Sequence, residues 1–174
     1  NAHTSREETA YYLRLLPEHL PLGVDILADI LTESMLPETE IERERRVIIQ
    51  EIGQSVDTPD DLVFDLYARS AYVDHTLGRP ILGTIDSVSN FGRGDLKAFL
   101  NRHYGAGQML VCAAGAVTQD ELVACIKGRL GGLRTANDTI RKAPVWSAGR
   151  QIVKRDLEQT HVVLGLPGIA ANDT

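Results

Sequence analysis

The sequence contains few cysteines and no long hydrophobic run. Two of its 174 residues are cysteine, Cys112 and Cys125, which is too few for a disulfide scaffold or a cysteine zinc knuckle. Both lie among apolar residues, so we expect buried, reduced thiols. No apolar run approaches the roughly 18 residues that a membrane-spanning helix needs. The sequence therefore indicates neither a disulfide-stapled domain nor a membrane partner.

The chain also lacks an excess of basic residues. It has 18 lysines and arginines against 24 aspartates and glutamates, for a net charge of -6 at pH 7. Proteins that bind nucleic acid need a basic face, so we expect no nucleic-acid partner. The hydrophobic fraction of 43% and the charged fraction of 24% are typical of an ordinary globular protein with a sizeable core.

Local motifs for a complete active site are missing as well. The five histidines are scattered along the chain: His3, His19, His75, His103 and His161. No two of them flank a glutamate at the spacing of a zinc-binding helix. The chain has neither a glycine-rich phosphate loop nor a Gly-x-Ser-x-Gly turn. Local chemistry alone therefore gives no complete active site in these 174 residues.

Hydrophobic periodicity predicts strands that alternate with pairs of helices. Residues 1–16 read as extended, and 74–84 as an ordered loop. The predicted helices cover residues 20–36, 37–56, 61–72, 94–104 and 118–130. The predicted strands that follow cover residues 107–117, 151–155 and 160–166. This alternation is typical of a layered α+β or α/β domain.

One predicted helix carries two acids where the pattern favours apolar residues. The apolar residues of 41–56 cluster on one side of a helical wheel, and Glu44 and Glu51 project inside this arc next to Val47. Seven residues are about two turns, so the two carboxylates stack on one line. A buried carboxylate without a partner is costly, so both acids need partners. Three interpretations stay open: a salt-bridge network with arginines, an edge of the apolar stripe that stays in contact with water, or a site that binds a metal or handles a proton.

Several stretches together resemble one protein family. In chain order they are "NAHTSREETAYY", "ERERRVIIQEIGQSVDTPDD", "HTLGRPILGT", "DLKAFLNRHYGAGQMLVCAAGAV" and "EQTHVVLGLPG". They resemble the pitrilysin/insulinase family of zinc metallopeptidases, and among these the bacterial members similar to the mitochondrial processing peptidase. The resemblance covers essentially all 174 residues.

The resemblance implies a fold and a division into domains. It implies an α+β fold in which helices cover a mostly antiparallel sheet, truncated at both ends of this chain. Residues 1–135 would form most of the first domain, 136–150 a linker, and 151–174 the opening strands of a second, similar domain. The chain would then be an internal piece of a longer protein.

The resemblance also assigns roles to the two acids. Family members bind zinc through a His-x-x-Glu-His motif, in which the glutamate is the general base, and through a glutamate on a later helix. Glu51 matches that third zinc ligand, and Glu44 matches a supporting acid that does not bind the metal. The His-x-x-Glu-His motif is absent from the 174 residues. One zinc ion would therefore be shared with histidines outside this chain, and the chain alone is expected to be inactive.

The same resemblance implies a peptide substrate and a partner. Asn1 and Ala2 match positions on an edge strand that pairs with the substrate backbone. The intact protein would hydrolyse extended peptides or unfolded segments, together with the rest of its own chain or a homologous second chain. The alternative is a non-catalytic partner or scaffold subunit of the same fold, and a third possibility is an interaction domain in which both acids pair with arginine.

Overall fold

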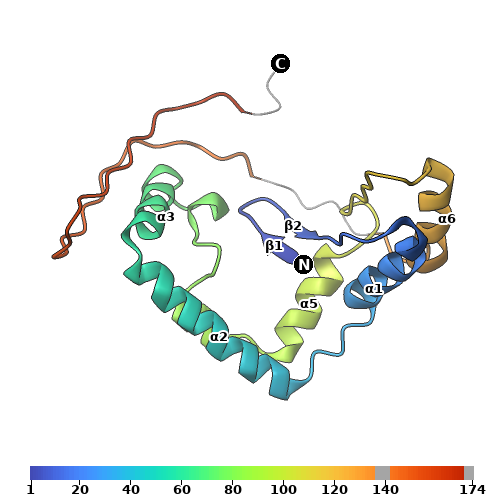
Figure 1. The fold of residues 1–174 in the computed structure, drawn as a ribbon. Helices are drawn as coiled ribbons and strands as arrows, with labels where there is room; N and C mark the ends of the chain where they lie inside the picture. Colours follow the sequence, from blue (N-terminus) through green and yellow to red (C-terminus); the bar gives the residue numbers. More distant parts are fainter. Residues whose placement is uncertain (136–141, 171–174) are drawn as a thin grey trace. The chain divides into compact units, whose positions relative to one another are not determined.

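The computed structural model describes residues 1–135 and 142–170 of the chain (Figure 1). The chain forms two compact units: the described part of the first comprises residues 1–42 and 91–135, and that of the second 43–90 and 142–170. The elements in chain order are β1 (Ala2–Thr4), β2 (Thr9–Tyr11), η1 (Pro17–His19), α1 (Leu20–Thr32), α2 (Glu38–Asp57), α3 (Pro59–Ala71), η2 (Thr76–Gly78), α4 (Ile85–Asn90), α5 (Arg93–His103) and α6 (Gln119–Leu130).

Helices α1 and α6 pack against each other in the first unit (Figure 1). Their polar contact is an ion pair in which Arg129 Nε lies 2.9 Å from Asp25 Oδ1. Helix α1 buries the small residues Gly23 and Ala28. A Cβ atom at Gly23 would collide with the side chain of Leu15, so the glycine allows the segment before α1 to cross the helix closely.

The connector that leads into α2 is fixed by Arg93, at the start of α5. The Arg93 guanidinium donates from Nε to the Leu36 carbonyl oxygen and from Nη2 to the Met35 carbonyl oxygen, each at 2.9 Å. Leu36 has a φ of 46°, in the left-handed region that is unusual for a residue with a Cβ atom. The two hydrogen bonds hold the chain in this turn directly before α2 begins.

The core of the second unit lies between α2, α3 and α4. Its most buried apolar side chains are Ile52, Ala68, Ala71 and Val88. Residues 142–150 have no regular structure and lie along α3. There the Ser147 amide donates to the Ala71 carbonyl oxygen at 2.9 Å, and His75 Nε2 lies 2.9 Å from the Lys142 carbonyl oxygen.

All five helices predicted from periodicity are present, with small shifts at their ends. Pro59 occupies the first turn of α3. Thr58 is the N-cap residue of that helix but makes no side-chain cap bond, because its hydroxyl donates to the Gln54 carbonyl oxygen at 2.8 Å. Helix α4 was not predicted. It has only six residues, too few for a hydrophobic period to be recognised.

The strands predicted after residue 100 are not formed in the described part of the chain. Residues 107–117, 151–155 and 160–166 carry no strand, and no described strand lies beside them to complete a hydrogen-bonded ladder. Their apolar side chains are consequently open to solvent, with Leu110 89% and Leu164 87% exposed. The predicted burial of both thiols is also wrong, since Cys112 is exposed and Cys125 is half-buried.

The α+β class is confirmed, with helices as the dominant element. The sheet of the described residues is the two-stranded antiparallel pair β1–β2. None of the described helices combines the length and the apolar character that crossing a membrane would require. The domain division into 1–135, 136–150 and 151–174 stays a prediction, and residues 136–141 and 171–174 lie outside the described part.

Helix α6 begins with a capping box formed by Thr118 and Glu121. The Glu121 amide donates to Thr118 Oγ1 at 3.3 Å, and Glu121 Oε2 accepts from the Thr118 amide at 2.9 Å and from the Thr118 hydroxyl at 2.7 Å. These bonds, first that of the hydroxyl and then that of the amide, lower the pKa of Glu121 below its ordinary value of 4.5. Two amide donors that a helix start leaves unpaired are thereby satisfied.

Replacing Thr118 by alanine is expected to loosen the first turn of α6. Loss of such a cap costs about 1 kcal/mol, so amide exchange in this turn should accelerate about fivefold. Because the folded pKa of Glu121 is lowered, its contribution is present at neutral pH and is lost as the pH falls below about 4.5. Hydrogen exchange of wild type and Thr118→Ala, measured at neutral pH and below about pH 4.5, checks the loss of the cap and its pH dependence. Equal exchange of the two proteins at neutral pH would contradict the role of the cap.

Candidate functional site

Helix α2 carries both predicted site acids on a side that is open to solvent. Glu44 and Glu51 are exposed, and Val47 beside them is 43% exposed. The covered side of the helix is the centre of the apolar arc, where Ile52 is buried and Arg45 half-buried, and the two acids lie at the exposed edge of that arc. The expectation that the acids face inward is therefore wrong for the described residues. A helical wheel ranks polarity, but it does not show which side other elements cover.

Both carboxylates are free of protein partners in the described part of the chain. Neither Glu44 nor Glu51 makes a side-chain hydrogen bond or an ion pair there. This finding argues against the salt-bridge network as the reason for the two acids. The seven-residue spacing on a continuous helix places them on one side, about 10 Å apart along the axis.

The described residues contain no complete zinc site. The exposed Glu51 carboxylate has open lone pairs, and carboxylate oxygen is a normal zinc donor. No group of three or more His, Cys, Asp or Glu side chains that could hold a metal ion occurs in residues 1–135 and 142–170. Glu51 thus fits zinc as one ligand of a set whose other members the described residues do not supply.

Two arginines hold α2 in place away from this acidic side. An Arg45 guanidinium nitrogen donates to the Val88 carbonyl oxygen of α4. Arg155 Nη1 donates to the Val56 carbonyl oxygen in the last turn of α2 at 2.6 Å, where the helix dipole favours a positive charge. Both contacts lie within the second unit, and together they fix the helix while Glu51 stays open.

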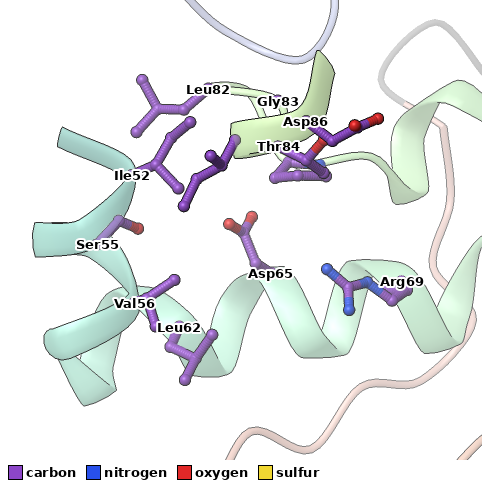
Figure 2. A pocket seen from close by; sticks show the side chains of 12 residues that line it. Ile52, Ser55, Val56, Leu62, Asp65, Arg69, Leu82, Gly83, Thr84 and Asp86 are labelled. Atoms are coloured by element: carbon purple, nitrogen blue, oxygen red, sulfur yellow. The ribbon is translucent and has the colours of Figure 1, made fainter. Parts of the chain in front are cut away.

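A cavity of about 380 Å³ opens beside the C-terminal turns of α2 (Figure 2). Its walls are the last turns of α2, one side of α3, the loop 80–84 and the start of α4, and the Asp65 carboxylate points into it. Sequence reasoning missed Asp65 and Arg69, because polar residues at helical spacing on α3 resemble an ordinary solvated face. Neither Glu44 nor Glu51 lines this cavity, so it is separate from the candidate metal ligand.

Strand β1, in the first unit, pairs with β2 along one edge, and its other edge is open among the residues that the structure describes. Asn1 and Tyr12 exchange two hydrogen bonds of 3.0 and 2.9 Å, and the neighbouring register pair is Ala2 with Tyr11. Bonded and non-bonded pairs alternate in an antiparallel ladder. The amide and carbonyl groups of Ala2 and Thr4 therefore point away from β2, along the open edge.

The sequence comparisons identify similar proteins over nearly the whole chain. Residues 1–85 match the family model described as insulinase (peptidase family M16), and residues 90–174 match that of the peptidase M16 inactive domain. An uncharacterized zinc protease of Streptomyces coelicolor is 36% identical over 99% of this chain and 40% of its own length. The mitochondrial-processing peptidase subunit beta of Saccharomyces cerevisiae is 37% identical over 98% of this chain and 38% of its own length. The chain thus spans about 40% of these relatives.

Solved structures share the fold. A protease from Helicobacter pylori superposes with a TM-score of 0.74 at 23% identity, covering 83% of this chain and 35% of that protein. A chain of complex III2 from Candida albicans superposes with a TM-score of 0.67 at 18% identity, covering 86% of this chain and 36% of its own. At these identities the likeness concerns the fold alone.

Proposed function

The chain belongs to the insulinase family of peptidases, family M16, and on that premise we propose that the complete protein is a zinc-dependent endopeptidase. The observation that carries the proposal is the Glu51 carboxylate, exposed and without a partner among the described residues, on the helix "ERERRVIIQEIGQ". Its proposed substrates are extended peptides and unfolded segments of proteins.

Glu51 and Glu44 have different proposed roles. Glu51 donates one anionic oxygen to the metal, and zinc, when bound, supplies an activated water and polarises the scissile carbonyl. Glu44 lies two turns earlier on the same side of α2, which suits a group that orients another ligand rather than one that binds the same ion. The two histidine ligands and the general base of the family motif are not among these 174 residues.

Strand β1 is the proposed docking edge for the peptide. Its outward amide and carbonyl groups at Ala2 and Thr4 can form a ladder with an extended substrate backbone. Asn1 bonds to Tyr12 and directly precedes Ala2, so it lies at the start of this edge. Main-chain bonds of this kind hold a peptide with little regard to its side chains, which suits a peptidase that acts on unfolded segments.

Metal analysis of two proteins tests the proposal. The complete protein is expected to bind one zinc ion and to cleave an unstructured peptide, to lose cleavage on chelation, and to regain it with zinc. The 174-residue chain alone should retain no stoichiometric zinc and cleave nothing, because its described residues gather no metal-binding group of three. Tight, equimolar zinc on the 174-residue chain would contradict the shared site.

The alternative is a non-catalytic partner subunit with the same fold, which binds a homologous chain. The description of the family model that matches residues 90–174, an inactive domain, keeps this alternative open. A complete protein without zinc, without cleavage and in a stable pair with a homologous chain would favour it. Glu51 argues for the peptidase, because it stands at the position that matches the third zinc ligand of the family, and a non-catalytic subunit has less reason to keep that acid.

A further inference from the structure

One face of the β1–β2 hairpin lies next to α5, and it carries the side chains of Ala2, Thr4, Thr9 and Tyr11. The register pairs Ala2 with Tyr11 and Thr4 with Thr9, and side chains that stand opposite each other project to the same face. The hydroxyl oxygens of Thr4 and Thr9 are 3.3 Å apart. These are also the pairs in which the β1 backbone points to its open edge. A residue that packs against this face therefore acts on Ala2 and Thr4, whose backbone amides point to the open edge.

Tyr104, directly after α5, contacts this face. Its hydroxyl lies 2.9 Å from that of Tyr11, and the two rings meet edge to face with centroids 6.3 Å apart. The Tyr104 amide donates to the Leu100 carbonyl oxygen, which ties the residue to the last turn of α5. Phe99 of the same helix packs against the Tyr104 ring with centroids 6.2 Å apart. Tyr104 is thus fixed to α5 through Leu100 and Phe99, and to β2 through its hydrogen bond with Tyr11.

The surroundings of the Tyr104 hydroxyl favour its neutral form. Burial and, after it, the hydrogen bond with Tyr11 raise the pKa of Tyr104 well above its ordinary value, while the Thr9 side chain acts in the opposite direction. A neutral phenol can both donate and accept. The favoured neutral form of Tyr104 is thus one that can share a hydrogen bond with the Tyr11 hydroxyl.

A hairpin of two three-residue strands needs such an anchor. An isolated two-stranded hairpin is marginally stable in water, and all three residues of β1 are exposed. A substrate that adds to a mobile edge must first order it, and that cost weakens binding. We infer that Tyr104, acting through Tyr11, is a positioning residue that holds the open edge of β1 ready for a peptide backbone. The inference rests on the proposed peptidase function.

The test replaces Tyr104 by phenylalanine in the complete protein. Loss of one half-buried hydrogen bond should raise KM for an unstructured peptide about three- to tenfold, with kcat and zinc content unchanged. Amide exchange of His3 and Ser5, which face β2, should accelerate by a similar factor. Tyr11→Phe should have the same effects, and the double variant should be no worse than either single one. Tyr12→Phe, one residue away on the other face, is the matched control and should change nothing.

Each outcome decides the inference. Unchanged hairpin exchange in Tyr104→Phe, or additive losses in the double variant, would overturn it whatever the enzyme does. Faster exchange with an unchanged KM would also overturn it, because the hairpin would then not govern substrate binding. A fall in zinc content or in kcat alone would reveal a general structural role and overturn it as well. If the wild-type protein shows no peptidase activity, the proposed function is refuted by that result alone. The inferred role of Tyr104 in substrate binding is then refuted as well.

Discussion

Glu51→Gln in the complete protein is expected to abolish both zinc retention and peptide cleavage. The amide has the shape of the carboxylate but carries no charge, so it is a much poorer ligand for a divalent ion. The substitution should leave the fold intact, since Glu51 is exposed and makes no side-chain hydrogen bond or ion pair with the described residues. Zinc content by mass spectrometry and cleavage of an unstructured peptide are the measurements.

Two substitutions of the same kind on α2 serve as comparisons. Glu44→Gln should lower activity or zinc affinity by about ten- to a hundredfold, the usual effect of losing a group that orients a ligand. Glu38→Gln, in the first turn of the same helix, should leave both at the wild-type level. Equal activity of Glu51→Gln and wild type would refute the assignment of the ligand. A stronger effect at Glu44 than at Glu51 would show that their roles are exchanged.

Ala2→Pro is expected to lower kcat/KM for peptides about ten- to a hundredfold while zinc content stays unchanged. Proline removes the outward amide of Ala2 and leaves a substrate carbonyl without its donor, at a cost of roughly 1–3 kcal/mol. The hairpin should survive, because this amide does not bond to β2 and proline is tolerated on an open strand edge. Steady-state kinetics with a peptide of fixed sequence measure the change.

The position of the proline within the strand provides the control. Ala2→Ser keeps the amide and should behave nearly as wild type. His3→Pro removes an amide that faces β2, so it should unfold the hairpin and accelerate exchange of its amides, whereas Ala2→Pro should not. If Ala2→Pro cleaves peptides as well as Ala2→Ser does, the substrate does not bond to this amide.

The helices were predictable because their signals are local. Pro37 before the acidic first turn of α2, Pro59 in the first turn of α3, and the Thr118 and Glu121 pair at α6 each act within one turn. Strands depend on a partner, which a local pattern cannot supply. Residues 107–117 have the composition of a buried strand, yet the described chain pairs nothing with them.

The residues of the candidate site could be proposed from the sequence, but their environment could not. Glu51 was selected by the family pattern, and Ala2 by its place in "NAHTS", from the sequence alone. Their exposure depends on which elements cover them, and the structure covers the centre of the apolar arc at Ile52 but leaves the edge with Glu51 exposed. The contact between Tyr11 and Tyr104 joins residues 93 positions apart, and no local signal in the sequence marks it.

The open edge of β1 also has a consequence for self-association. Unpaired backbone groups on a strand can bond to the same strand of another molecule, which is a route to aggregation. Here the strand has only three residues, and Arg6, Glu7 and Glu8 follow in the adjoining turn. A net charge of -6 adds repulsion between molecules. The edge is therefore long enough to hold one short stretch of peptide and too short and too charged to favour growth of a shared sheet.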